Sequence, residues 1–338
     1  MTANQAKVRW GVLGAAKIAT KQVIPAMRRG QWSDVVAIGS RDAAKARAAA
    51  DDLGVPTSHG SYEALLADPD VEAIYNPLPN HLHVPWSIKA LEAGKHVLCE
   101  KPIGLSVAEA EQLREARDRT GLLVQEAFMV RAHPQWLRVR ELIRDGRIGE
   151  LRSMMGYFSY FNRDPGNIRN VPGFGGGSMM DIGCYLINTA RWTFGREPRR
   201  VVAMIDRDPD MHVDRLASFM LEFDNGHAVG TCSTQVVPYQ RVQIIGTTGR
   251  IQIDIPFNAP ADRPCRIMVD SGRDLFGGGG ESISLPTCDQ YTLQGDLFSR
   301  AIREGGSVAY PLEDTIANMK VIEAVLRSGK TGAWEVPK

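Results

Sequence analysis

Short apolar runs alternate with longer stretches of helical pattern through the first third of the chain. The apolar runs predict five buried strands, at Val8–Leu13, Val35–Gly39, Val71–Tyr75, His96–Cys99 and Leu122–Val124. The stretches between them are long enough for helices of about a dozen residues. Strands and helices that alternate in this way predict an α/β fold with a doubly wound parallel sheet of the Rossmann type.

The pattern changes after Ala127, where we expect a second domain. A helix over Pro134–Arg144 leads into longer strand-like runs joined by hairpin signals at Asp224–Gly226 and Thr248–Gly249. We therefore predict a Rossmann domain over residues 1–127 and an α+β domain with a large, mainly antiparallel, open sheet over residues 128–338. A helix near Leu312–Arg327 is expected to pack back on the first domain.

Composition narrows the class of protein without naming a function. The 338 residues contain 40 Lys and Arg against 39 Asp and Glu, so no charge excess indicates nucleic acid or a membrane surface as partner. No apolar run of about 20 residues and no basic-then-apolar leader is present, which predicts a cytoplasmic protein. The five cysteines include no CxxC pair, which indicates reduced thiols.

A small-residue turn follows the first strand and opens the next helix. Aligned with the G-x-G-x-x-G/A pattern, its key positions are Gly14, Ala16 and Ala19, so two of the three glycines are replaced by alanine. The strand–turn–helix context is nevertheless what binding of a dinucleotide pyrophosphate requires. The alternative is a plain turn without a ligand. The residues expected to contact the cofactor here are Gly14, Ala15, Ala16, Lys17 and Ile18.

The end of the second strand should distinguish NADP from NAD. Ser40 and Arg41 stand where an NAD enzyme usually places a carboxylate, with Asp42 one residue later and Lys45 beyond it. A hydroxyl and cationic side chains suit a 2′-phosphate better than a bare ribose diol, so we favour NADP. The alternative is that Ser40 and Asp42 cap the following helix and that Arg41 is solvated.

A lysine follows the fourth strand at its carboxyl end, where open α/β sheets bind their ligands. In the tripeptide Glu100-Lys101-Pro102, Lys101 can hold a substrate hydroxyl and favour its alkoxide beside a nicotinamide. The lysine pKa, about 10.4 when free, should fall near a positively charged nicotinamide ring. The alternative is an exposed lysine that pairs with Glu100.

The second domain offers an acid–base candidate. Asp181 and Tyr185 are four residues apart in an expected helix over Ser178–Thr193, so they share one face. Tyr185 can act as general acid–base if a cation such as Lys101 lowers its pKa, and the alternative is a core aromatic. A polar loop before the glycine run 173–177 contains Asp164 and Arg169, which can hydrogen-bond a sugar or polyol or can simply be solvated. No third metal ligand accompanies His81 and His83, so no metal site is predicted.

Four segments together resemble the Gfo/Idh/MocA oxidoreductases over almost the whole chain. They are GVLGAAKIA (11–19), YNPLPNHLH (75–83), AGKHVLCEKP (93–102) and GGSMMDIGCYLIN (176–188). The resemblance implies that Lys101 is the catalytic lysine. Many members have histidine where this chain has Tyr185, and the tyrosine is similar to the branch with glucose-fructose oxidoreductase, dimeric dihydrodiol dehydrogenase and NADP-linked xylose dehydrogenases. The resemblance also implies further cofactor contacts from Pro77, Asn80, His83, Glu100, Arg131 and Tyr291, and a homodimer through the open sheet.

These observations lead to one main hypothesis and two alternatives. The main hypothesis is an NADP-dependent sugar oxidoreductase that moves hydride between C1 of a cyclic aldose and the nicotinamide. In it, Tyr185 takes the hydroxyl proton, Lys101 stabilises the oxyanion and Asp181 orients the sugar. The first alternative is an aldose–aldose or glucose–fructose type enzyme that keeps NADP bound, oxidises one sugar to a lactone and reduces another to a polyol. The second is a non-catalytic regulator that senses NADP.

Overall fold

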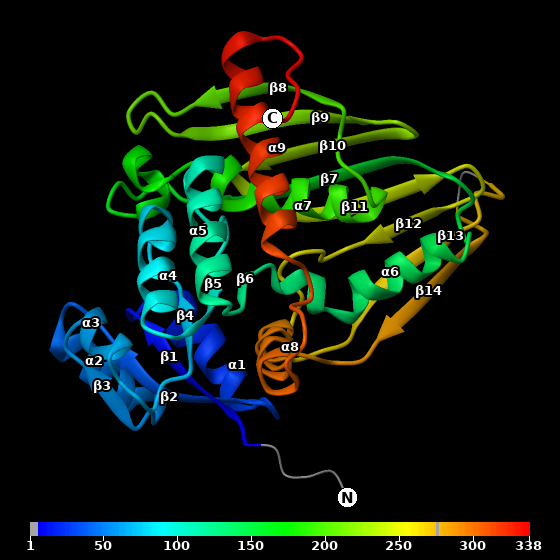
Figure 1. The fold of residues 1–338 in the computed structure, drawn as a ribbon. Helices are drawn as coiled ribbons and strands as arrows, with labels where there is room; N and C mark the ends of the chain where they lie inside the picture. Colours follow the sequence, from blue (N-terminus) through cyan, green and yellow to red (C-terminus); the bar gives the residue numbers. More distant parts are fainter. Residues whose placement is uncertain (1–5, 275–276) are drawn as a thin grey trace, which may run out of the picture. The chain divides into compact units, whose positions relative to one another are not determined.

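The computed structural model describes residues 6–274 and 277–338, and these form two compact units (Figure 1). Unit 1 contains the described residues up to Met129 together with Asp289–Ile316. Unit 2 contains Val130–Cys288 and Ala317–Lys338, without the residues that the structure does not describe. The segment 289–316 therefore belongs to unit 1, whereas the sequence pattern assigned it to the second domain.

Unit 1 is built on a six-stranded parallel sheet in the order β3-β2-β1-β4-β5-β6, which confirms the predicted doubly wound fold. The strands are β1 (Val8–Leu13), β2 (Ser33–Gly39), β3 (Thr57–His59), β4 (Ala73–Asn76), β5 (His96–Cys99) and β6 (Val124–Glu126). Strand β3 was not predicted, because its three half-buried residues are polar or charged and give no apolar run.

Helices and helical turns connect these strands. They are η1 (Ala19–Val23, a π-helical segment), α1 (Ile24–Arg28), α2 (Ala43–Leu53), α3 (Tyr62–Leu66), η2 (Asn80–Leu82), α4 (His83–Glu92), α5 (Val107–Thr120) and α8 (Gln290–Glu304). Helix α5 begins with a side-chain cap, since the Ser106 hydroxyl accepts a hydrogen bond from Glu109 N at 3.2 Å. The turn η3 (Met129–Ala132) lies where the chain passes from one unit to the other.

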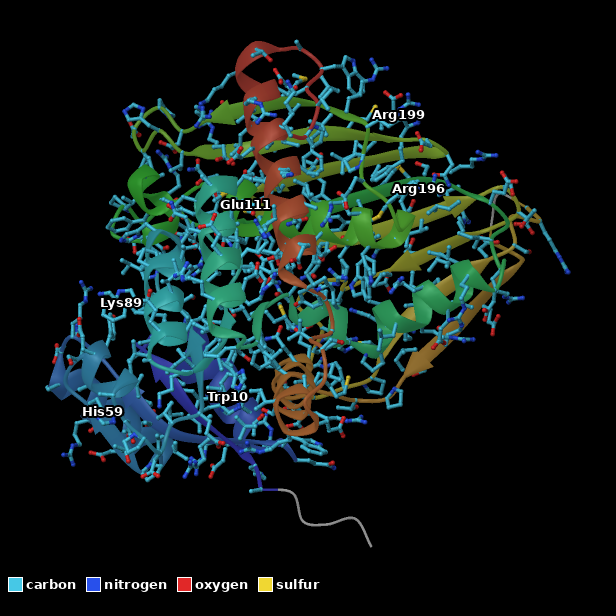
Figure 2. The ribbon with its side chains drawn as sticks, in the orientation of Figure 1. Trp10, His59, Lys89, Glu111, Arg196 and Arg199 are labelled. Atoms are coloured by element: carbon cyan, nitrogen blue, oxygen red, sulfur yellow. The ribbon has the colours of Figure 1, made fainter. Side chains whose placement is uncertain are left out.

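Helix α8 joins unit 1 through side chains that the local pattern does not reveal. The Asp296 carboxylate accepts hydrogen bonds from Gln31 N at 2.8 Å and Trp32 N at 2.9 Å, just before β2. The Trp10 indole, in β1 (Figure 2), donates to Ser299 Oγ at 2.9 Å. These contacts join residues more than 260 positions apart, which explains why the segment 289–316 completes the first unit rather than the second.

Unit 2 is built on an eight-stranded sheet in the order β14-β13-β12-β11-β7-β10-β9-β8. Its strands are β7 (Leu151–Phe161), β8 (Arg200–Arg207), β9 (Asp214–Phe223), β10 (Gly226–Ser233), β11 (Gln235–Gly246), β12 (Arg250–Ile253), β13 (Cys265–Asp270) and β14 (Gly280–Leu285). All neighbouring pairs are antiparallel except β7 and β10. Both predicted hairpins, β9–β10 and β11–β12, are therefore confirmed.

One face of this sheet is packed against helices of unit 2 (Figure 1). The helical segments are α6 (Pro134–Arg144), η4 (Ile168–Asn170), η5 (Pro172–Phe174), η6 (Met179–Gly183, π-helical), α7 (Cys184–Phe194) and α9 (Leu312–Thr331), which belongs to unit 2 from residue 317 onward. Helix α7 contacts β7 and β10, and α6 contacts β13. Among the described residues, no helix has both the length and the apolar character needed to cross a bilayer.

Candidate active site

The carboxyl ends of four strands of unit 1 lie at one edge of the parallel sheet. The register pairs Leu13 of β1 with Gly39 of β2, and Asn76 of β4 with Cys99 of β5. Strand β1 also pairs with β4, so the order of the sheet reverses between them. The residues that follow these strands, Gly14, Ser40, Pro77 and Glu100, therefore share the edge where open α/β sheets bind ligands.

The turn after β1 has the backbone that a dinucleotide turn requires. Gly14 has a φ of 79°, and its N–H donates to Gly39 O at 2.6 Å. A Cβ atom at this position would lie 3.2 Å from Leu78 Cδ2 and 3.6 Å from the Tyr62 hydroxyl oxygen. The left-handed backbone and the close neighbours both favour glycine. Ala15 and Ala16 are half-buried, so a ligand can approach the backbone that follows. This geometry fits a bound pyrophosphate.

Two polar side chains that follow β2 accept hydrogen bonds from backbone N–H groups of their own segment. Ser40 Oγ accepts from Asp42 N at 3.2 Å, and Asp42 Oδ1 accepts from Lys45 N at 3.1 Å at the start of α2. Asp42 is therefore the helix cap that the capping alternative described. Arg41 is exposed, and Lys45 Nζ lies 3.8 Å from the Asp42 carboxylate. Since the Ser40 hydroxyl accepts here, its own proton can be donated to a ligand.

Lys101 follows directly on a buried carboxylate. Glu100 accepts a hydrogen bond from the Tyr75 hydroxyl of β4 at 2.7 Å, which links the ends of two neighbouring strands. Lys101 itself is half-buried, and its peptide bond to Pro102 is cis. Tyr291, the second residue of α8, is close enough to be influenced electrostatically: burial and then the Glu100 and Asp289 charges raise the pKa of its hydroxyl. Tyr291 thus lies near the end of β5.

His83, which the resemblance implies as a cofactor contact, is buried between two backbone carbonyls. The side chain is 1% exposed, with Nδ1 2.7 Å from Pro102 O and Nε2 2.6 Å from Leu78 O. Burial lowers the pKa of His83 to about 4, although both carbonyl contacts act in the opposite direction. The ring therefore bridges the loop after β4 and the loop after β5, and this position indicates a structural role. Asn80, which begins η2, is half-buried nearby in sequence.

Unit 2 contributes a carboxylate held by two donors. Asp181, in η6, accepts from the Tyr160 hydroxyl at 2.5 Å on one oxygen and from Arg169 Nε at 3.0 Å on the other. Burial and then the Asp181 charge raise the pKa of Tyr160, so its hydroxyl stays protonated. Tyr185, in the first turn of α7, is 5% exposed, and its ring packs against Phe158 at a centroid distance of 5.9 Å.

Two other residues predicted for the site have local partners in unit 2. The Asp164 carboxylate is exposed and accepts from Gly166 N at 2.9 Å within its own loop. The Arg131 guanidinium lies 4.9 Å from the centre of the Trp192 ring. Across the described residues, no group of three or more His, Cys, Asp or Glu side chains could hold a metal ion.

Sequence reasoning missed two tyrosines. Tyr62, at the start of α3, is 5% exposed, and among the described residues nothing hydrogen-bonds its hydroxyl, which faces the Gly14 turn. Tyr160, near the end of β7, reaches Asp181 from 21 positions away. Neither residue stands in a motif, and the sole signal is an aromatic residue at a terminus of an element: Tyr62 begins a helix, and Tyr160 is the second-last residue of a strand.

Comparison with known proteins adds evidence that is independent of this geometry. Residues 8–128 match the family model described as "Oxidoreductase family, NAD-binding Rossmann fold", and residues 136–252 match "GFO/IDH/MocA C-terminal domain". An uncharacterized oxidoreductase, ORF334 of Rhizobium meliloti, is 47% identical over 97% of this chain and 98% of its own. D-xylose 1-dehydrogenase (NADP(+)) 2 of Haloferax volcanii is 37% identical over 96% and 98%.

A solved structure is also similar over nearly the full length. It is KijD10, a 3-ketoreductase from Actinomadura kijaniata in complex with NADP and TDP-benzene. The TM-score is 0.89 at 31% identity, and the match covers 95% of this chain and 98% of the other.

The position of His83 predicts a stability effect. In His83→Ala the buried ring and its bridge between two carbonyls are lost, and the free energy of unfolding should fall by about 2–4 kcal/mol. Urea unfolding measures this change, with the exposed His227→Ala as the matched control. Unchanged stability together with weaker nucleotide binding would instead support His83 as a cofactor contact.

Proposed function

This chain belongs to the GFO/IDH/MocA family of oxidoreductases, and we propose that within it the protein is an NADP-dependent sugar oxidoreductase. The reaction we propose transfers hydride between C1 of a cyclic aldose and the nicotinamide, so that aldose and lactone interconvert. The observation that carries the proposal is the shared strand edge of unit 1, because the Gly14 turn follows β1 there and the Glu100-Lys101 segment follows β5. Similarity to an NADP-linked xylose dehydrogenase supports the choice of substrate class.

The cofactor would be held by residues of unit 1. The Gly14 turn and the amides after it suit the pyrophosphate, and the Tyr62 hydroxyl is available to a ligand of that turn. Ser40, Arg41 and Lys45 would surround the 2′-phosphate. When bound, the nicotinamide accepts or returns the hydride of the sugar carbon.

The proposed chemistry divides between two side chains. Lys101 donates a hydrogen bond to the reacting hydroxyl and stabilises its developing negative charge, while Tyr185 in tyrosinate form takes the hydroxyl proton. The C–H electron pair leaves as hydride, and the oxygen lone pair forms the new C=O bond. Asp181, already held by Tyr160 and Arg169, accepts from another sugar hydroxyl and orients the ring. Reduction follows the same steps in reverse.

A second candidate is reduction of a ketone on a nucleotide-linked sugar. Similarity to the KijD10 3-ketoreductase favours it. Purified protein incubated with aldoses and NADP, and in parallel with 3-keto nucleotide sugars and NADPH, separates the candidates by absorbance at 340 nm and product analysis. Turnover of aldoses alone supports the lactone-forming reaction, and turnover of the keto sugars alone replaces it with ketone reduction.

We also propose a homodimer that forms through the uncovered face of the unit 2 sheet. The strand register places Val202, Met220, Val229 and Met155 in one row across β8, β9, β10 and β7. Met155, Val229 and Met220 are 43%, 38% and 36% exposed, whereas their neighbour Met154 is buried. A continuous apolar row of this kind is typical of a protein interface.

Removal of the Lys101 ammonium should stop the chemistry and spare cofactor binding. Lys101→Ala is expected to lower kcat by about 10²–10⁴-fold, because the developing alkoxide loses its donor, while the Kd for NADP stays within a few-fold. Stopped-flow turnover and fluorescence titration of NADPH measure the two effects. Normal turnover in this variant would refute the role of the lysine.

Arg41 should select NADP over NAD. In Arg41→Ala the 2′-phosphate loses a charge-assisted contact, and the affinity for NADP should fall about 10–100-fold while the affinity for NAD changes little. Calorimetric titration with both nucleotides checks this, and Arg47→Ala in the helix α2 that follows serves as the control. An equal loss of affinity for NADP and NAD would contradict the assignment of Arg41 to the 2′-phosphate.

The apolar row should be sensitive to charge. Val229→Lys places an ammonium in the middle of the row and is expected to convert dimers to monomers. Light scattering coupled to size-exclusion chromatography measures the mass, and the exposed Asp52→Lys in unit 1 controls for added charge. A wild-type protein that elutes as a monomer at tens of micromolar would contradict the dimer.

A further inference from the structure

The loop between β7 and η6 is folded so that it holds the backbone of Arg169 from both sides. The Asn167 side chain accepts from Arg169 N at 3.1 Å, and Gly177 N donates to Arg169 O at 2.9 Å. A Cβ on Gly176 would lie 2.6 Å from Arg169 O and 2.8 Å from Val171 O, so the chain can close over this carbonyl because residue 176 has no side chain. The glycine run therefore fixes Arg169 beside η6.

The side chain of Arg169 contacts η6, the helical segment that continues directly into α7, where Tyr185 lies. Arg169 Nε donates to Asp181 at 3.0 Å, and Asp181 stands one helical turn before Tyr185. The Asp181 charge is the largest cause that raises the pKa of Arg169, and the hydrogen bond to Asp181 acts in the same direction. Asp181 lies four residues before Tyr185 along η6 and α7, so the guanidinium that binds Asp181 lies within one helical turn of the residue that carries the phenol.

We propose that Arg169 is a positioning residue for Tyr185, and that its guanidinium stabilises the tyrosinate that takes the proton of the substrate. This rests on the proposed function, in which Tyr185 is the acid–base group. Unit 2 thus carries its own cation for the tyrosine.

The charged groups near Tyr185 in unit 2 determine whether removal of Arg169 raises or lowers the pKa of the tyrosine. Asp181 opposes ionisation of the phenol, but its charge is shared with Arg169 on one oxygen and with Tyr160 on the other. Tyr160 remains neutral because its pKa is raised. The rings of Phe158 and Phe257 add no charge and limit water around Tyr185. Removal of Arg169 would take away a cation near the phenol and would also break the ion pair that offsets the Asp181 charge, so both losses act against the tyrosinate.

A direct titration of Tyr185 tests this without turnover. Protein labelled with ¹³Cζ-tyrosine is titrated by NMR, and the Tyr185 signal is assigned by its loss in Tyr185→Phe. In Arg169→Gln the pKa of Tyr185 should rise by about one unit or more, and Arg169→Lys should restore most of the wild-type value. Arg163→Gln is the matched control, since this loop arginine pairs with Asp210 and Asp208 and not with Asp181. An unchanged Tyr185 pKa in Arg169→Gln overturns the proposal.

A second variant and a kinetic measurement test the same network if Arg169→Gln cannot be studied. If Arg169→Gln fails to fold, Tyr160→Phe leaves Arg169 in place but removes one donor from Asp181. The Tyr185 pKa should then rise by a smaller amount, and no rise would count against the network. In active protein, the limb of the kcat–pH profile that reports Tyr185 should move with the NMR value in each variant.

Failure of the inference and failure of the proposed function give different results. If Tyr185→Phe is inactive but Arg169→Gln leaves the NMR pKa unchanged, the function stands and the role of Arg169 falls. If Tyr185→Phe retains full turnover, Tyr185 is not the acid–base group, whatever its pKa.

Discussion

Parallel pairing of β1, β2, β4 and β5 is the constraint on which the candidate site depends. In a parallel sheet every strand ends at the same edge, so four turns separated by up to about 90 residues begin at that one edge. Gly14 keeps its backbone accessible there, and Glu100 links two strand ends through Tyr75. His83 ties the loops after β4 and β5 together beneath that edge.

Unit 2 supplies a different kind of order, in which the short helical turn η4 carries the charge that pairs with Asp181. Asn167 and the glycines at 176 and 177 hold Arg169 by its backbone, and its side chain meets Asp181. This arrangement leaves no motif in the sequence, because the contact between Arg169 and Asp181 joins η4 to the later helical segment η6. In the role proposed for it, Arg169 acts on Tyr185 from a segment outside the helix that carries the tyrosine.

Apolar runs and small-residue turns predicted most of the fold, because strands buried on both faces leave a direct mark on the sequence. Strand β3 was not predicted, because the edge strand of Thr57, Ser58 and His59 buries too little apolar surface to show a pattern. The position of α8 in unit 1 was not predicted either, because it depends on hydrogen bonds from residues 31 and 32 to Asp296. For the site, strand ends indicated where Gly14, Ser40 and Lys101 lie, whereas the partners of Asp181 come from tertiary contacts that spacing does not encode.

Isotope transfer tests the central claim, direct movement of hydride from a sugar carbon, most directly. An aldose deuterated at C1, such as xylose, is oxidised with NADP, and the coenzyme and product are analysed by mass spectrometry. The account predicts one deuterium in the NADPH and a lactone that has lost its label. A coenzyme without deuterium, or a product oxidised at another carbon with its C1 label retained, would contradict it.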